Sequence, residues 1–330
     1  MLRGLLGKIA TDREVESAFI ECGTLTRPSL DEDDEDQHYD WVLVRRKGVE
    51  LGFVDAAYFR GEIKPLWRSE GLILNQLTFY SDTRGSVKAY EGKLPHGLSM
   101  HDTRATVREK LISCESTRRS YLTDRWDIEN YRLIVAYKPN DAGLDSVHIK
   151  LPIWPYPEHA REQPTVAADE WLSLFGEPQN SETLQLNLTP LNIVERIEED
   201  EDEREVSFTD ACGITLYFEE ARRIKLPALR LTDRTLVFSA VKFFRARDQE
   251  ARQYSGALPL GLDFNDSPET LLKKLGRKPD KHDDGSTTGR ALWHFQQFSL
   301  QVLYSTLENH LFRIMLMAPG YWHEFGELDD

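Results

Sequence analysis

An internal repeat constrains the fold of this chain more than any other feature of its sequence. Residues 90–98, Tyr-Glu-Gly-Lys-Leu-Pro-His-Gly-Leu, agree at six positions with residues 254–262, Tyr-Ser-Gly-Ala-Leu-Pro-Leu-Gly-Leu, which begin 164 residues later (254 − 90). The match continues toward the C-terminus, where Trp126 and Trp293 correspond at an offset of 167 residues. An offset that changes so little over a long stretch indicates that one structural unit occurs twice in tandem.

Each copy has the pattern of an α+β unit. Strands are expected at 41–45, 49–53, 72–80, 131–137 and 147–149 in the first copy, and at 206–209, 214–218, 236–244, 298–304 and 312–317 in the second. Helical segments are expected near the start of each copy, at 2–19 and 168–175. Apolar residues recur at every second position from Tyr131 to Tyr137, as in a strand with one buried face. We therefore predict two tandem units, each an antiparallel sheet of about five strands with helices on one face.

A short helix should follow each Leu-Pro-x-Gly-Leu turn. Asp102 and Asp266 stand where the N-cap of that helix is expected, because a carboxylate at this position accepts hydrogen bonds from the first backbone amides. Lys110 and Lys274 then read as exposed charges near the end of the same helices. These repeated titratable residues thus have structural roles and do not indicate catalysis.

A proline-rich segment separates the two copies. Prolines at 152, 155, 157 and 164 surround Trp154, and such a spacing is typical of a stiff, extended connector. We predict repeat unit one at 1–153, a Pro-rich linker at 154–164, and repeat unit two with a C-terminal tail at 165–330.

The charge balance excludes some classes of partner. The chain has 56 acidic and 41 basic residues, which gives a formal net charge of -15. A chain with this charge repels nucleic-acid phosphates and anionic membrane surfaces, so we expect neither direct nucleic-acid binding nor membrane association. The same balance is compatible with a basic protein partner, and equally with a charge that only keeps the protein soluble.

The cysteines and the first residues predict a cytoplasmic protein. Cys22, Cys114 and Cys212 lie far apart, and an odd count argues against a disulfide framework. We expect reduced, buried thiols. The apolar run in residues 1–7 is too short for the core of a signal peptide, and no run approaches the ~20 apolar residues of a membrane span.

Two acidic runs precede the first expected strand of their copies and are the main candidates for partner binding. They consist of Asp31, Glu32, Asp33, Asp34, Glu35 and Asp36 in the first copy, and of Glu198, Glu199, Asp200, Glu201, Asp202 and Glu203 in the second. Such runs form solvated loops, either to maintain solubility or to steer a basic surface toward the protein. Calcium binding is disfavoured because both runs lack the alternating ligands and glycine of an EF-hand loop.

Trp154 and Trp322 are further candidates for partner binding. Both follow the terminal prolines of their copies, outside the strand pattern. They either pack at the junction of the two units or, if exposed, anchor an interface, since Trp is enriched at interface hot spots.

No catalytic, cofactor-binding or metal-binding motif is recognisable. The nine histidines lack metal-ligand spacing, and His282 lies in a polar Lys-His-Asp-Asp-Gly stretch that reads as a loop. The nucleophile elbow, the phosphate-binding loop and the dinucleotide fingerprint are all missing from the sequence. We therefore expect a protein without enzymatic activity, cofactor or metal.

The repeated motif resembles several bacterial domains. Leu94-Pro95-His96-Gly97-Leu98 and Leu258-Pro259-Leu260-Gly261-Leu262, each followed by a short helix and by strands, resemble units of the β-lactamase inhibitory protein and of small outer-membrane assembly lipoproteins. The pattern is most similar to immunity proteins encoded beside polymorphic or type VI secretion toxins. Unlike the first two groups, this chain shows no lipid-modification signal and no paired cysteines.

These observations lead to one functional hypothesis and two alternatives. The resemblance implies a cytosolic immunity protein that binds a cognate toxin and occludes its active site. A nuclease toxin fits the acidic balance, because a nuclease groove is basic. The alternatives are an adaptor or chaperone for a secreted effector, and an enzyme with a site in a cleft between the repeats.

Overall fold

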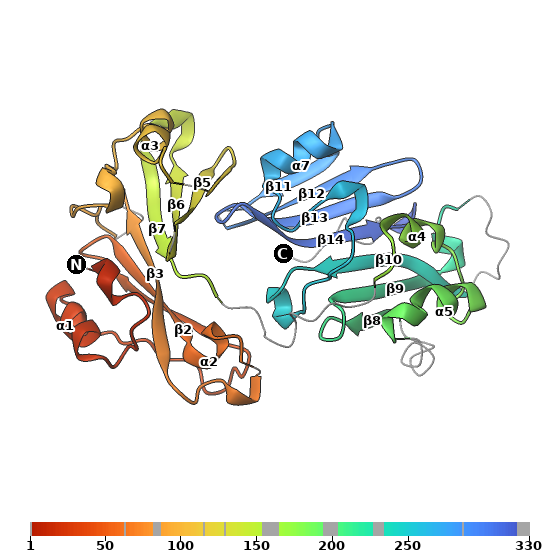
Figure 1. Cartoon of the computed structure of the whole chain (residues 1–330), viewed down its shortest axis with the longest axis horizontal. Helices are drawn as coiled ribbons and strands as arrows, with labels where there is room; N and C mark the ends of the chain where they lie inside the picture. The colour runs from red at the N-terminus through yellow and green to blue at the C-terminus, as the bar shows by residue number, and fades with distance from the viewer. Residues whose placement is uncertain are drawn as a thin grey trace. The chain divides into compact units, whose positions relative to one another are not determined.

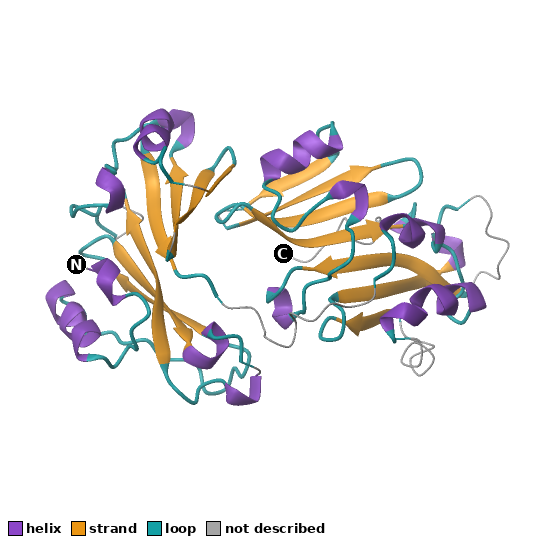
Figure 2. Cartoon of the chain, in the orientation of Figure 1, coloured by secondary structure: helices purple, strands orange, loops and turns teal. Residues whose placement is uncertain are grey.

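A computed structural model of the chain describes residues 2–62, 64–81, 87–114, 116–128, 130–153, 165–193, 204–226, 234–285 and 287–321 (Figure 1). The chain divides into two compact units, Met1–Pro157 and Glu158–Asp330. Strands make up most of both units and the helices are short (Figure 2). In the part of the chain that is described, no helix is long and apolar enough to cross a membrane.

The first unit is built on a seven-stranded antiparallel sheet. Its strands are β1 (Tyr39–Val44), β2 (Val49–Asp55), β3 (Leu72–Tyr80), β4 (Ser116–Arg119), β5 (Thr123–Ile128), β6 (Tyr131–Tyr137) and β7 (Leu144–Lys150). They are ordered β1-β2-β3-β7-β6-β5-β4. The helices of this unit are α1 (Arg13–Cys22), α2 (Ala56–Phe59) and α3 (Arg104–Lys110).

The second unit repeats this sheet. Its strands are β8 (Glu205–Phe208), β9 (Ile214–Glu220), β10 (Leu236–Phe244), β11 (Lys281–Asp284), β12 (Thr288–His294), β13 (Ser299–Ser305) and β14 (His310–Met317). Their order, read from β8, is β8-β9-β10-β14-β13-β12-β11, which is the order of the first sheet strand for strand. The helices are α4 (Ala168–Ser173), α5 (Glu182–Leu188) and α7 (Pro268–Leu275).

The two repeated tryptophans occupy the same position in the two sheets. Trp126 on β5 is paired with Leu133, and Trp293 on β12 is paired with Leu300. Both indole rings are buried in the core of their unit. The α+β class and the tandem arrangement thus agree with the repeat in the sequence.

The number of strands was predicted wrongly, since each sheet has seven strands and not about five. The missed strands form the hairpins β4–β5 and β11–β12. The edge strands of these hairpins read Ser-Thr-Arg-Arg and Lys-His-Asp-Asp, without the alternation of apolar residues that indicates a strand. They are strands because their backbones pair with a neighbour that carries the buried tryptophan.

The first helical segment was also predicted too long. A 3-10 turn at Leu2–Leu5 and α1 at Arg13–Cys22 replace the continuous helix expected at 2–19. Gly7 between them has a φ of +86°, which a helix does not accommodate. In the second unit α4 ends at Ser173, two residues before the expected end.

Apolar faces of helices and strands form the cores. In the first unit Phe19 of α1 and Val107 of α3 pack in one cluster with Phe53 of β2, while α2 belongs to a separate cluster with Val54 and Ile73. In the second unit one large cluster holds Trp171 of α4, Leu184 of α5, Leu271 of α7 and strand residues such as Phe238.

The Leu-Pro-x-Gly-Leu turns have the same conformation in both units. The residue after proline is left-handed in each case, with φ 54° and ψ 23° at His96 and φ 58° and ψ 22° at Leu260. Gly97 and Gly261 follow, both with φ +67°. This repeated backbone explains why proline and glycine are retained at the same two positions of the motif.

The predicted N-caps lie one residue too early. Thr103 and Ser267 cap the helices, and their hydroxyl oxygens accept the amides of Thr106 and Thr270 at 3.3 and 3.2 Å. The preceding carboxylates have another role. Asp102 binds the ammonium of Lys110 at 2.7 Å, and Asp266 binds that of Lys274 at 2.8 Å.

Both lysines remain partly exposed on their helices, as expected, and they also tie the helix to the turn. Lys110 Nζ also donates to the carbonyl of Gly97 at 2.8 Å, and Lys274 Nζ donates to the carbonyl of Gly261 at 2.7 Å. Only about a third of each lysine side chain is exposed, at 31% and 33%.

Candidate functional site

The predicted binding residues fall into a described and an undescribed group. The first acidic run, residues 31–36, forms a loop before β1 and is called the acidic loop below. The second acidic run (198–203), Trp154 and Trp322 lie outside the described residues, as does the whole predicted linker at 154–164.

The acidic loop is ordered by cations from the same unit. The guanidinium of Arg68 donates to the backbone carbonyls of Asp31 at 2.7 Å and Gln37 at 3.2 Å, and also to that of Asp34. Lys64 Nζ lies 2.6 Å from Asp36 Oδ1, and this hydrogen bond lowers the pKa of Asp36 below its usual value. Lys64 also lies 3.8 Å from Glu35, so it pairs with the last two carboxylates of the loop. Arg68 binds backbone carbonyls and pairs with none of the six carboxylates, and all six acidic residues are exposed.

Arg68 is itself held by a buried carboxylate. Asp55, at the end of β2, has no solvent exposure. Its Oδ1 accepts the amide of Tyr58 at 2.9 Å as the N-cap of α2, and its Oδ2 accepts the amide of Arg68 at 2.6 Å. The amide contact fixes Arg68 in a left-handed conformation with a φ of +66°, from which its side chain reaches the acidic loop.

Five rings lie next to the acidic loop. This aromatic cluster consists of His38, Tyr39, Trp41, Tyr58 and Trp67. The His38 ring stacks on Tyr58 with centroids 3.7 Å apart, and Tyr58 meets Trp67 edge-on at 5.1 Å. Tyr39 contacts Tyr58 at 5.8 Å and lies nearly parallel to Trp41 at 6.3 Å. The rings thus form one continuous series from α2 to the edge strand β1.

The exposed end of this series is Trp41. Its side chain is 42% exposed, whereas Tyr58 and Trp67 are 3% and 8% exposed. Trp41 faces Gly52 on β2, and a β-carbon at Gly52 would overlap its ring. The aromatic cluster therefore has a buried base, which fixes the ring positions, and one tryptophan that remains partly exposed to solvent.

The second unit has different residues at the equivalent positions. Glu205 of β8 corresponds to Trp41, and Tyr217 of β9 corresponds to Gly52, because each pair occupies the same register between the first two strands. The Tyr217 hydroxyl donates to Glu205 at 3.2 Å, so this site is closed by a hydrogen bond within the sheet. The exposed tryptophan is thus a specialisation of the first unit.

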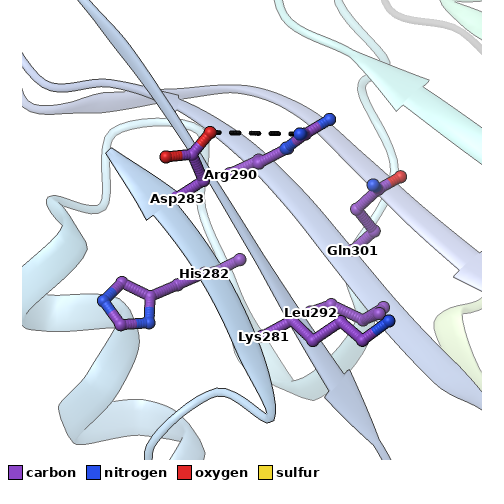
Figure 3. A pocket seen from close by; sticks show the side chains of 7 residues that line it. Lys281, His282, Asp283, Arg290, Leu292 and Gln301 are labelled. Carbon is purple, nitrogen blue, oxygen red and sulfur yellow. Dashed lines mark ion pairs between the residues drawn. The ribbon is translucent and has the colours of Figure 1, made fainter. Parts of the chain in front are cut away.

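A shallow cavity of about 210 Å³ lies on the hairpin β11–β12 and on β13 of the second unit (Figure 3). Asp283 and Arg290 form a long ion pair of 3.9 Å at its side, and Lys281 and Gln301 contribute polar ends. His282 points away from this group of side chains (Figure 3). The predicted loop around His282 is the edge strand β11, and its ring is exposed.

Among the described residues, no group of three or more His, Cys, Asp or Glu side chains is close enough to hold a metal ion. The cysteines carry no reactive signal, because burial raises the pKa of Cys212 to about 12 and also raises the pKa of Cys22 and Cys114. Only Cys212 is buried, so the expectation of three buried thiols was wrong for the other two.

Comparison with protein families, with curated proteins and with solved structures gives no match for this chain. The function must therefore be argued from the geometry of the molecule itself.

One feature of the sequence points to the aromatic cluster. Tyr39 and Trp41 stand two residues apart shortly after the acidic run, which places both rings on one face of the strand that follows the six carboxylates. The other members could not be assigned to this place, because Tyr58 and Trp67 reach it only through the fold of α2 and the segment after it.

Proposed function

We propose that this protein binds a basic protein partner through the acidic loop and the aromatic cluster of its first unit. The observation that carries the proposal is the exposed Trp41 on strand β1, which follows the six exposed carboxylates of the acidic loop in the chain. Tryptophan supplies a large apolar contact that is enriched at interface hot spots. The carboxylates of the preceding loop attract a cationic surface and accelerate association. A rigid aromatic base also reduces the entropy lost on binding.

The partner that fits best is a cognate bacterial toxin that this protein neutralises by covering its active site. Two features support this choice. The chain carries a net charge of -15, and the groove of a nuclease toxin is basic because it binds phosphates. The repeated turn motif resembles that of immunity proteins encoded beside secreted toxins, including type VI effectors. The protein would act in the cytoplasm as a stoichiometric inhibitor, without catalysis or cofactor.

Growth rescue in a surrogate bacterium tests this function. The protein encoded by the adjoining gene is expressed alone and together with this chain. We expect arrested growth in the first case and normal growth in the second. If the neighbour is harmless, or if this chain leaves the arrest unchanged, the immunity function is wrong. A harmless neighbour whose secretion requires this chain would instead establish an adaptor.

A pair of matched variants tests the site. The site variant combines Asp33→Asn, Asp34→Asn, Glu35→Gln and Trp41→Ala, and we expect it to lose the rescue. The control variant combines Glu21→Gln, Glu91→Gln and Glu109→Gln, which removes three exposed carboxylates elsewhere on the first unit. We expect the control to rescue growth fully. Equal rescue by both variants would place the contact surface elsewhere.

A further inference from the structure

The edge strand β1 carries backbone groups that point out of the first sheet. The amide of Asp55 donates to the carbonyl of His38 at 2.9 Å, so His38 faces β2. Because antiparallel pairing alternates, Asp40, Val42 and Val44 also bond to β2, and the amides and carbonyls of Trp41 and Leu43 face outward. In the described part of the chain, no residue forms a hydrogen bond with the backbone of Trp41 or Leu43.

Of the four edge strands in the two sheets, β1 is the least protected against pairing. The edge strands β4, β8 and β11 have four residues each. Strand β4 contains Arg118 and Arg119, β8 contains Glu205, and β11 has the sequence Lys-His-Asp-Asp. Short length and charged side chains are the usual protection of an edge. Strand β1 has six residues, Tyr-Asp-Trp-Val-Leu-Val, with one charge and no lysine or proline.

We propose that the partner binds by strand addition, in which an extended segment bearing Lys or Arg pairs with β1 as an eighth strand of the first sheet. This inference rests on the proposed function and adds the mode of binding and the chemistry of the bound segment. Outward amides and carbonyls supply the main-chain hydrogen bonds that give affinity in this mode. The side chains of Tyr39, Trp41 and Leu43 lie on one face of β1 and contact alternate residues of the added strand.

Charge selects a basic segment over a second copy of this chain. The acidic loop ends three residues before β1 begins, so a strand paired with β1 extends toward six carboxylates. Lysine or arginine in the added strand balances the negative charge of the acidic loop. A cation over the face of the Trp41 ring gains a further, cation–π attraction. A second copy would bring another net charge of -15 to the same edge, which opposes association.

Two isomeric peptides test strand addition directly. The probe is acetyl-Lys-Val-Arg-Val-Lys-Val-Arg-amide, titrated into the full chain by calorimetry in about 50 mM salt, where screening is weak. In the added strand, the backbone amides of every second residue point toward β1, and the amides of the residues between them point toward solvent. One isomer is N-methylated at three basic residues and the other at the three valines. We expect their affinities to differ by at least about tenfold, the effect of one lost hydrogen bond or more.

Proline variants of the protein provide the second test. Leu43→Pro removes an outward amide that makes no bond in the sheet, and proline is tolerated at such edge positions. Ser207→Pro is the matched control, because Ser207 holds the equivalent outward position on β8. We expect L43P to bind the unmethylated peptide about tenfold more weakly while circular dichroism shows an intact fold, and S207P to bind it as the wild type does.

The outcomes separate this inference from the proposed function. If the two methylated isomers bind alike, or if L43P folds and binds the peptide normally, strand addition is wrong even where growth rescue succeeds. If growth rescue fails while the isomers differ as expected, the immunity function is wrong and the basic strand-binding edge stands. A wild-type dimer that L43P converts to a monomer in analytical ultracentrifugation would make a second copy the occupant and overturn the proposal.

Discussion

The indole ring of Trp41 lies directly over Gly52, its partner on the neighbouring strand β2. No other residue type fits beneath the ring in this position, because a β-carbon at Gly52 would overlap three of its ring carbons. Glycine inside a strand weakens it, so its presence here indicates a close approach of another group. In the second unit the same two positions hold Glu205 and Tyr217, so no tryptophan ring lies over the neighbouring strand there.

The contact between Trp41 and Gly52 predicts a strong coupling between substitutions at the two positions. We expect Gly52→Ala to lower the free energy of unfolding by about 1–3 kcal/mol, because the ring has to move. In a Trp41→Ala background the same change should cost close to nothing. Urea denaturation of the four proteins measures the coupling. An equal cost of Gly52→Ala in both backgrounds would contradict the contact.

The lysine clamps of the two turns should contribute equally to stability. Lys110→Met and Lys274→Met each remove an ion pair and a hydrogen bond to a turn carbonyl. Since both lysines are about one-third exposed, we expect a loss of roughly 1 kcal/mol in each case. Lys273→Met is the control, because Lys273 is 73% exposed and makes only a pair with Glu269. Thermal unfolding midpoints that fall no further for the clamps than for this control would show that the clamps are unimportant.

An ion pair with a buried carboxylate in the first unit has an apolar counterpart in the second. Asp124 has no exposure, and it accepts hydrogen bonds from Arg108 at 2.6 and 2.9 Å and from the Tyr137 hydroxyl at 3.0 Å. The equivalent positions hold Ala291 and Leu272. We expect Asp124→Ala alone to cost about 1–3 kcal/mol, because it removes the acceptor of the Tyr137 hydroxyl and of the Arg108 guanidinium, which is partly exposed.

The double variant Arg108→Leu with Asp124→Ala should be more stable than Asp124→Ala alone by about 1 kcal/mol or more. It removes the cation that has lost Asp124 and introduces the residue types that the second unit uses. Denaturation midpoints of the single and double variants measure this difference in stability. A double variant less stable than Asp124→Ala would show that Arg108 has a structural role beyond this pair.

Salt should weaken the binding of a basic segment at the acidic loop. Exposed charges are screened over a Debye length of ~10 Å at about 0.1 M salt. We expect the affinity of the wild type for the basic heptapeptide to fall as salt rises from about 0.05 to about 0.5 M. A variant with Asp33→Asn, Asp34→Asn and Glu35→Gln should bind more weakly at low salt and respond less to salt. If its salt dependence equals that of the wild type, the loop only maintains solubility.

Thiol modification should follow burial. Burial raises the pKa of Cys212 to about 12, so at pH 8 this thiol stays protonated and shielded. Cys22 and Cys114 are partly exposed, and burial raises the pKa of each thiol without closing access to it. We expect iodoacetamide to label Cys22 and Cys114 in the native protein and Cys212 only after unfolding, as measured by peptide mass spectrometry. Early labelling of Cys212 would contradict its burial.

The repeat in the sequence was sufficient to predict the duplicated α+β architecture and the equivalence of its two turns. Proline and glycine act locally on the backbone, so Leu-Pro-x-Gly-Leu folds into the same left-handed turn at His96 and at Leu260. The paired tryptophans were likewise predictable, because a large buried ring keeps its place in a core when a unit is duplicated.

Other features were decided only by the tertiary structure. The hairpins β4–β5 and β11–β12 carry charged residues, so their strand character comes from pairing with a neighbour and not from an apolar period. The aromatic cluster brings His38 into contact with Trp67, which lies far from it in the sequence. This contact depends on the buried Asp55, which fixes the backbone at Tyr58 and Arg68. Burial and register arise when the sheet assembles, and a linear sequence contains neither of them explicitly.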